Sequence, residues 1–131
     1  MENRILFVDD DDLVLSCFER LFGRRFNLET ALGPSDGMKA ITTHGPYAVI
    51  VSDMRMPEMT RIEFLAKAKD ISPETVGLVL TGDIGRVPVE DAAHAGCVFR
   101  FVEKPCPPDD LAGILEEALA QYRLNVQARV Q

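Results

Sequence analysis

Short apolar runs alternate with segments of helical periodicity along this chain of 131 residues, and this alternation limits the possible folds more than any other feature. Continuous apolar runs are typical of strands that are buried on both faces of a sheet. Strands that pair in parallel need a long crossover connection, which a helix supplies. The alternation therefore predicts one α/β domain of doubly wound (βα)5 architecture, with a five-stranded parallel sheet, helices on both faces and right-handed crossovers.

The expected elements can be placed from periodicity and from turn residues. The expected strands cover residues 4–8, 26–31, 47–52, 75–80 and 97–102. The expected helices cover residues 12–22, 33–43, 60–70, 87–95 and 108 onward. Ser35 and Thr60 are the predicted N-caps of the second and third helices. In the first helix, Val14, Phe18 and Leu21 recur at helical spacing and are expected to face the sheet.

The length and the hydrophobic content fit one globular domain. Hydrophobic residues make up 47% of the chain, which is enough for a sizeable core. The domain is expected to cover residues 1–121. Residues 122–131 continue the apolar spacing, so they are expected to extend the last helix or to begin a linker.

Charge and cysteine content narrow the possible partners. The net charge is -7, from 21 acidic and 14 basic residues, so direct binding to a nucleic acid is not expected, whereas a divalent cation or a basic partner suits the chain. The three cysteines form no Cys-x-x-Cys pair, so no zinc site is expected. The odd number of cysteines, together with the lack of an apolar leader after Met1, predicts that the protein is located in the reducing cytoplasm. The apolar runs are too short to cross a membrane.

Polar side chains follow four of the expected strands. Asp9 and Asp10 follow the first strand, Asp53 the third, Thr81 the fourth and Lys104 the fifth. Because the carboxyl ends of parallel strands share one edge of a sheet, these residues are expected to converge there. Carboxylates together with water are the ligands that Mg²⁺ prefers. The sequence therefore predicts a magnesium site, with Lys104 as a second, fixed cation.

Four segments carry a resemblance to a known family: "ILFVDDD", "VIVSDMRMPEM", "LVLTGD" and "FRFVEKP". In this order and at this spacing, the chain resembles the receiver domain of bacterial two-component response regulators, and in particular the chemotaxis regulators. The resemblance extends from Ile5 to about Gln121. It implies the flavodoxin-like strand order 2-1-3-4-5.

The resemblance implies a phosphorylation site. Asp53 would be the phosphoacceptor, because a carboxylate can act as a nucleophile and form an aspartyl phosphate. Asp9, Asp10 and Asp53, with the backbone carbonyl of Arg55, would hold Mg²⁺, or Mn²⁺ as an alternative ion. N-capping of the first helix is the competing explanation for the acidic run, although Asp11 or Asp12 can do that.

The resemblance also implies the residues that surround the phosphoryl group. Lys104 would form an ion pair with it, and Pro105 after that lysine is expected to be cis. Thr81 would donate its hydroxyl to a phosphoryl oxygen, and the small residue Gly82 would leave room and offer its N–H. Phe101 would be the switch aromatic that turns inward together with Thr81, although its spacing does not distinguish it from Phe99.

Some residues depart from the family pattern. Thr60 and Arg61 stand where members often carry Asp-Gly, so the geometry of this loop is expected to differ. Arg55 and Asp83 are expected to frame the mouth of the site. They would form a salt bridge, or Arg55 would contact the phosphoryl group, or both would be solvated charges. Cys106 stands where an aromatic is common, and we interpret it as a small packed residue.

These features predict a phosphoacceptor signal receiver. It would take a phosphoryl group from a phosphohistidine of a sensor histidine kinase, or of a histidine phosphotransfer protein, in a magnesium-dependent reaction. It would then change a surface over residues 87–121, made of the fourth helix, the fifth strand and the fifth helix. This surface would serve an output domain, an output protein or a homodimer. The domain would catalyse only its own phosphorylation and dephosphorylation.

Two alternatives remain open. The first is a phosphate-independent interaction module on the same fold, although Asp53, Thr81 and Lys104 are all present. The second is a hydrolase of the haloacid-dehalogenase type, suggested by the carboxylates of Asp10 and Asp12. In that class Gly-Thr would follow, whereas this chain has Leu-Val at that place and lacks the length for a cap domain.

Overall fold

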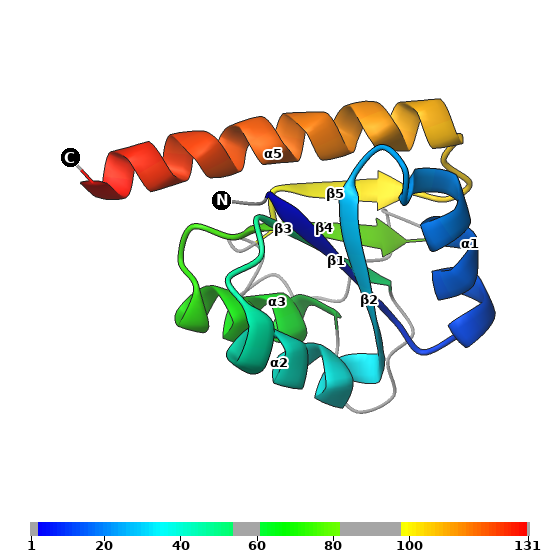
Figure 1. Cartoon of the computed structure of the whole chain (residues 1–131), viewed down its shortest axis with the longest axis horizontal. Coiled ribbons are helices and arrows are strands. Elements are labelled where there is room, and N and C mark those ends of the chain that lie inside the picture. Colours follow the sequence, from blue (N-terminus) through cyan, green and yellow to red (C-terminus); the bar gives the residue numbers. More distant parts are fainter. Residues whose placement is uncertain (1–2, 54–60, 82–97, 131) are drawn as a thin grey trace.

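The computed structural model describes residues 3–53, 61–81 and 98–130, without the side chains of Asp53, Arg61, Ile62 and Val130. Within these ranges the chain forms strands and helices in alternation (Figure 1). The elements are β1 (Arg4–Asp9), α1 (Asp12–Phe22), β2 (Asn27–Leu32), α2 (Gly33–His44), β3 (Val49–Asp53), α3 (Arg61–Ile71), β4 (Val76–Thr81), β5 (Arg100–Glu103) and α5 (Pro108–Val130). The helix predicted over residues 87–95 lies outside the described residues.

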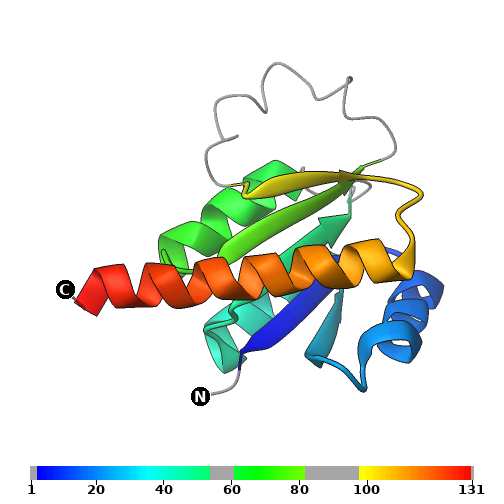
Figure 2. The same ribbon diagram turned by 90° about the horizontal axis from the view of Figure 1, so that it is seen from above.

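The five strands form one parallel sheet of order β2-β1-β3-β4-β5. Helices α1 and α5 cover one face of the sheet, and α2 and α3 cover the other (Figures 1 and 2). The predicted fold class and strand order are therefore confirmed. In a sheet of this order, β1 and β3 are neighbours although two helices and a strand separate them in sequence, so their carboxyl ends lie together at one edge.

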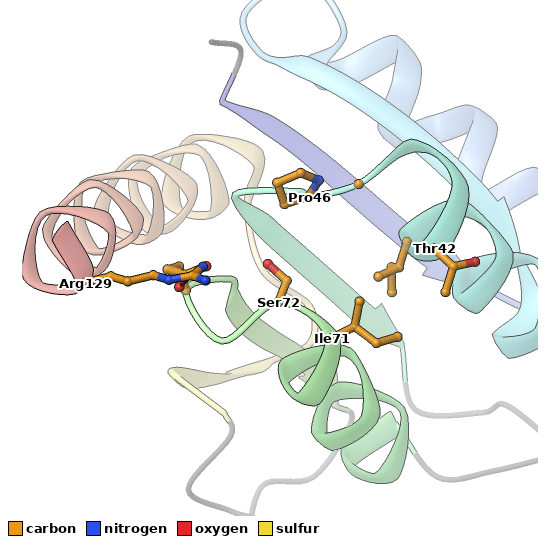
Figure 3. Close-up of a pocket in the computed structure, with 8 residues that line it drawn as sticks. Thr42, Pro46, Ile71, Ser72 and Arg129 are labelled. Carbon is orange, nitrogen blue, oxygen red and sulfur yellow. Dashed lines mark hydrogen bonds and ion pairs between the residues drawn. The ribbon is translucent and has the colours of Figure 1, made fainter.

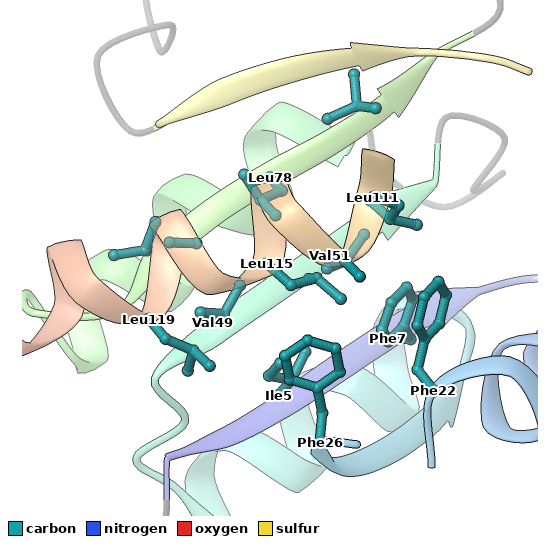
Figure 4. Packing of buried hydrophobic residues seen from close by; sticks show 14 of the residues in the cluster. Ile5, Phe7, Phe22, Phe26, Val49, Val51, Leu78, Leu111, Leu115 and Leu119 are labelled. Atoms are coloured by element: carbon teal, nitrogen blue, oxygen red, sulfur yellow. The ribbon is translucent and has the colours of Figure 1, made fainter. Parts of the chain in front are cut away.

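Alternate residues of the central strands enter two hydrophobic clusters, one on each face. In β1, Ile5 and Phe7 face α1 and α5, whereas Leu6 and Val8 face α2 and α3. Strands β3 and β4 divide their side chains in the same way. Figure 4 shows the first cluster, in which Leu111 and Leu115 of α5 lie over the strands. Burial on both faces explains why each of these strands contains a continuous apolar run.

The buried face of α1 differs from the predicted one. Leu15 and Phe22 are buried, Val14 and Phe18 are partly buried, and Leu21 is 50% exposed. Phe18 stacks on Phe7 of β1 at 4.4 Å between ring centroids, and Phe22 lies 6.3 Å from the same ring. Aromatic pairs at these separations add to the burial energy. This packing rotates the helix so that the prediction for Leu21 was wrong.

The start of α2 also differs from the prediction. The N-cap residue is Leu32, which makes no side-chain capping hydrogen bond, and Ser35 is an exposed residue inside the first turn. Gly33 adopts a φ of 82°, which glycine tolerates because it has no Cβ. Pro34 follows at a position where the missing N–H costs nothing. Backbone geometry rather than a serine cap therefore begins this helix.

Several strand boundaries shift by one or a few residues. Asp53 and Thr81 are the last residues of β3 and β4 rather than the first residues after them. Strand β5 begins at Arg100 rather than at residue 97. Helix α5 continues without interruption to Val130, through the position where the predicted domain ends. Among the described residues, no helix combines the length and the apolar composition that crossing a membrane requires.

Polar side chains form a hydrogen-bonded network at the edge of the sheet where the strands begin. Tyr47 donates its hydroxyl to Glu29 at 2.6 Å, and Arg4 donates to the other oxygen of the same carboxylate at 3.2 Å. The Arg4 guanidinium also lies 4.6 Å from the centroid of the Tyr47 ring. Burial raises the pKa of the Glu29 carboxyl, but the bonds from Tyr47 and Arg4 and the charge of Arg4 outweigh it, so the pKa lies below its ordinary value.

Candidate functional site

The register of the sheet brings the predicted site residues to one edge. Val8 of β1 is paired with Ser52 of β3, so the next residues, Asp9 and Asp53, end two neighbouring strands. Asp53 is paired with Leu80 of β4, and the following residue Thr81 is paired with Glu103 of β5. Lys104 comes directly after Glu103. The carboxyl ends of four strands therefore carry the predicted phosphoacceptor, one predicted metal ligand, the hydroxyl and the amine.

The carboxylates after β1 have different roles. Asp11 caps α1, because its Oδ1 accepts a hydrogen bond from the Leu13 N–H at 2.9 Å. Asp9 is only 4% exposed, and its Oδ1 accepts a bond from the Asp11 N–H at 2.9 Å. Asp10 is exposed and lies between them. Capping, the competing explanation for the acidic run, therefore applies to Asp11 and leaves Asp10 facing solvent at the edge.

Thr81 and Lys104 are joined through the main chain. The Lys104 N–H donates to the Thr81 carbonyl at 2.7 Å, which continues the β4–β5 ladder beyond its last residue pair. Thr81 is fully buried, and Lys104 is exposed. The peptide bond between Lys104 and Pro105 is cis. The two residues predicted to contact the phosphoryl group therefore lie on adjacent strands, at the same level of the sheet.

The two phenylalanines of the fifth strand region differ in their surroundings. Phe101 is partly buried and packs against the cluster between the sheet and the α2–α3 layer. It is paired with Val79, two residues before Thr81. Phe99 is 40% exposed and precedes β5. Only Phe101 of the two is therefore in contact with the core next to Thr81, although its role as a switch stays a prediction.

The residues at this edge suit a magnesium ion by their chemistry. Asp9 and Asp10 supply hard carboxylate oxygens at the end of β1, and Asp53 supplies a third carboxylate by its position at the end of the neighbouring strand. Two or three carboxylates with open access to water are typical of Mg²⁺ sites. Of the four predicted ligands, Arg55 and the side chain of Asp53 lie outside the described parts.

Other predicted residues also lie outside the described ranges. They are Gly82, Asp83, Thr60 and the whole fourth-helix part of the partner surface. The predicted change of loop geometry at Thr60 and Arg61 therefore stays a prediction. Helix α3 begins at Arg61.

An apolar groove beside Lys104 was not predicted. It has a volume of about 560 Å³ and lies between α1 and the β5–α5 connection. Its walls are Val14, Phe18, Leu80, Lys104, Pro105, Cys106 and Leu111. Burial, and then the charge of Asp110, raises the pKa of the Cys106 thiol, so the thiol stays protonated at neutral pH. Cys106 is a small residue in this wall. A small side chain where an aromatic is common was the only feature of the sequence that indicated space here.

Comparison with known proteins found a family model that matches most of this chain. The family model described as "Response regulator receiver domain" matches residues 5–116. The hydrogenase transcriptional regulatory protein HoxA of Cupriavidus necator is 27% identical over 95% of this chain and 27% of its own length. The chain spans about a quarter of the length of the curated relatives it matches.

Two solved structures extend the comparison to the fold. A crystal structure described as adenylate cyclase from Rhodopirellula baltica is 35% identical, with a TM-score of 0.89 over 98% of this chain and 96% of that one. A CheY-like response regulator receiver domain protein from Methanospirillum hungatei is 24% identical, with a TM-score of 0.81 over 94% of this chain and 98% of that one. The second shows likeness of fold alone.

Proposed function

This chain belongs to the family of response regulator receiver domains, and we propose on that basis that it is a phosphoacceptor in a two-component phosphorelay. It takes a phosphoryl group onto Asp53 from a phosphohistidine of a sensor histidine kinase or of a histidine phosphotransfer protein. The observation that carries this proposal is the sheet register, which ends β1, β3 and β4 at Asp9, Asp53 and Thr81 on one edge.

The reaction is a transfer of the phosphoryl group between two nucleophiles. A carboxylate oxygen of Asp53 attacks the phosphorus, the bond from phosphorus to the histidine nitrogen breaks, and the imidazole leaves with the electron pair. Asp9, Asp10, Asp53 and the Arg55 carbonyl hold Mg²⁺, or Mn²⁺ in its place. When bound, this ion offsets the repulsion between the carboxylate and the phosphoryl oxygens.

The opposite side of the phosphoryl group is held by the last residue of β4 and the first residue after β5. Lys104 forms an ion pair with a phosphoryl oxygen, and Thr81 donates its hydroxyl to another. The main-chain bond between these two residues supports this assignment, because it fixes the two strand ends at one level. Such fixed donors position the transferred group without a large reorganisation.

The phosphorylated domain acts through a partner and transforms no free metabolite. The proposed partner surface comprises the fourth helix, β5 and α5, and Phe101 reports the state of Thr81 to it. An output domain or protein binds there, and so does a second copy if the domain forms a dimer. The phosphorelay proteins of this kind act in the cytoplasm, where we place this chain.

Intact mass after incubation with Mg²⁺ and acetyl phosphate tests the proposal. The wild-type chain should gain one phosphoryl group, and the Asp53→Asn variant should gain none. Wild type with EDTA should also gain none. A folded wild-type sample that gains no phosphoryl group and does not bind Mg²⁺ or beryllofluoride would instead support the phosphate-independent module.

A further inference from the structure

The end of α5 makes contacts that the proposed phosphorylation does not use. The family match ends at residue 116, whereas α5 continues to Val130. Gln121, Asn125 and Arg129 recur every four residues in this last part, so they lie on one face of the helix. Figure 1 shows that this part of α5 reaches past the starting ends of the strands, away from the candidate site.

Glu74 lies in the connection between α3 and β4 and accepts hydrogen bonds from this face of the helix. The Asn125 side-chain amide donates to the Glu74 carbonyl at 3.0 Å. The Arg129 guanidinium donates to the Glu74 carboxylate at 2.6 Å. Gln121 donates to the Asn125 side-chain oxygen at 2.8 Å, which fixes the orientation of that amide. One residue of the connection therefore binds two successive turns of α5.

The connection that carries Glu74 is itself firmly held. Thr75 donates its hydroxyl to the Tyr47 carbonyl at 2.7 Å, and the Ser72 hydroxyl lies 2.8 Å from the same oxygen atom of Thr75. The Val76 N–H donates to the Ala48 carbonyl at 2.9 Å. The residues directly after Glu74 are therefore bonded to the start of β3, which fixes the connection to the sheet.

The contact between α5 and this connection is narrow and polar. A hollow of about 400 Å³ opens on one side of the Glu74–Arg129 pair, and one of about 510 Å³ opens on the other. Figure 3 shows the first hollow, with Arg129 reaching from α5 toward the connection that carries Ser72. The side chain of Glu74 is 11% exposed and that of Arg129 is 69% exposed.

The earlier part of α5 is held differently. Leu111, Leu115 and Ala118 are buried in the core, whereas Leu124 in the last part is 58% exposed. Full apolar burial of the helix therefore ends at about Leu119, Tyr122 still packs against the core at partial burial, and the contacts of Asn125 and Arg129 beyond it are polar. Single hydrogen bonds, and an ion pair whose arginine is 69% exposed, each contribute modestly, so this attachment is weaker than the apolar one.

We propose that Gln121, Asn125 and Arg129 form a reversible latch on Glu74, which docks the last turns of α5 on the sheet or releases them while the core stays folded. The latch joins α5 to the start of β4, the strand whose other end is Thr81. It determines the direction in which residues 121–130 leave the domain. The latch does not depend on the phosphorylation proposed above, so a result that contradicts one proposal does not contradict the other.

Hydrogen exchange of the backbone amides tests the latch. The double variant Asn125→Ala/Arg129→Ala removes both bonds to Glu74, and alanine favours a helix at least as well as the residues it replaces. Faster exchange would therefore not come from a loss of helix propensity. We expect the amides of residues 121–130 to exchange roughly fivefold faster or more, as expected for the loss of modest polar contacts. The amides of residues 111–119 should be unchanged.

Two further measurements keep the test decisive. Arg123→Ala removes the same charge from an exposed position of the same helix and should leave the exchange unchanged. Glu74→Gln removes the ion pair alone and should give a smaller acceleration than the double variant. Exchange in the double variant equal to that of the Arg123 control would overturn the proposal. So would an equal acceleration over the whole of α5.

Discussion

At the scale of single residues, neighbouring carboxylates with the same chemistry acquire different tasks. Asp11 is fixed as the N-cap of α1 by its bond to the Leu13 N–H. Asp9 is buried at the end of β1, whereas Asp10 is exposed. The start of a helix favours negative charge, which lowers the cost of crowding these groups. A cation bound at Asp9 and Asp10 would lower that cost further.

Glu29 makes the stability depend on pH, and this dependence can be predicted in sign. Its pKa lies below the ordinary value of 4.5, so its contribution to stability is present above that pH and is lost as the pH falls through the folded-state pKa. The Glu29→Gln variant should therefore be less stable than wild type at pH 7. The difference should shrink as the pH falls below 4.5. Urea unfolding across this range measures it.

A matched control separates this effect from the general loss of a carboxylate. Glu19 is an exposed residue on α1, and Glu19→Gln should show no comparable change with pH. A difference between wild type and Glu29→Gln that stays constant from pH 7 to pH 3 would contradict the assignment to Glu29.

At the scale of elements, close approach of two helices depends on one glycine. A Cβ at Gly37 of α2 would lie 2.7 and 2.9 Å from ring carbons of Phe64 on α3, and 3.2 Å from a methyl of Val8 on β1. Phe64 is fully buried, so its ring has no room to retreat. The absence of a side chain at Gly37 therefore allows α2 to pack against both α3 and β1.

Gly37→Ala should destabilise the protein, although alanine is the better helix former. Overpacking of this kind costs about 1–3 kcal/mol, against a gain of about 1 kcal/mol from helix propensity. We expect a net loss of about 1 kcal/mol in the free energy of unfolding, with Gly113→Ala as the control. A Cβ at Gly113 on α5 meets no atom within 4 Å, so that variant should gain up to about 1 kcal/mol. Urea unfolding measures the free energy of unfolding of both variants. Equal changes in this free energy for Gly37→Ala and Gly113→Ala would contradict the packing argument.

At the scale of the whole molecule, the two edges of the sheet, where the strands end and where they begin, carry different groups of polar residues. The strands end at the candidate phosphorylation site, and they begin at the edge that holds the Glu29 network and the latch on Glu74. Helix α5 spans both, because it starts after the Lys104–Pro105 connection and ends at the opposite edge (Figure 2). A single helix therefore lies along the sheet from one of these edges to the other.

Magnesium should stabilise the folded chain if the proposed site binds it. A ligand that binds only the folded state adds about 2.7 kcal/mol when its free concentration is a hundred times its dissociation constant. Asp10→Asn should lose most of this gain. Asp36→Asn, which removes the same charge from an exposed position on α2, should keep it. Urea unfolding at pH 7 with and without Mg²⁺ measures the gain, and an equal gain in all three proteins would place the ion elsewhere.

The sequence predicted the parallel sheet, its strand order by resemblance, and the residues that end the strands. Such predictions succeed because strand burial on two faces leaves a continuous apolar run, and because chemistry at a sheet edge needs polar residues directly after that run. The shifts at Asp53 and Thr81, each by one residue, did not change which side chains reach the edge. The roles of the site residues in catalysis remain predictions.

By itself, therefore, the sequence determined the fold class and the candidate site, since both depend on patterns that are local along the chain. The tertiary structure decided the rest. It showed that Phe18 and Phe7 rotate α1 so that Leu21 is exposed, and that Gly33 rather than Ser35 determines the start of α2. It also placed Arg129 on Glu74. These outcomes depend on contacts between residues that are distant in sequence or on backbone geometry, and periodicity along a chain carries neither.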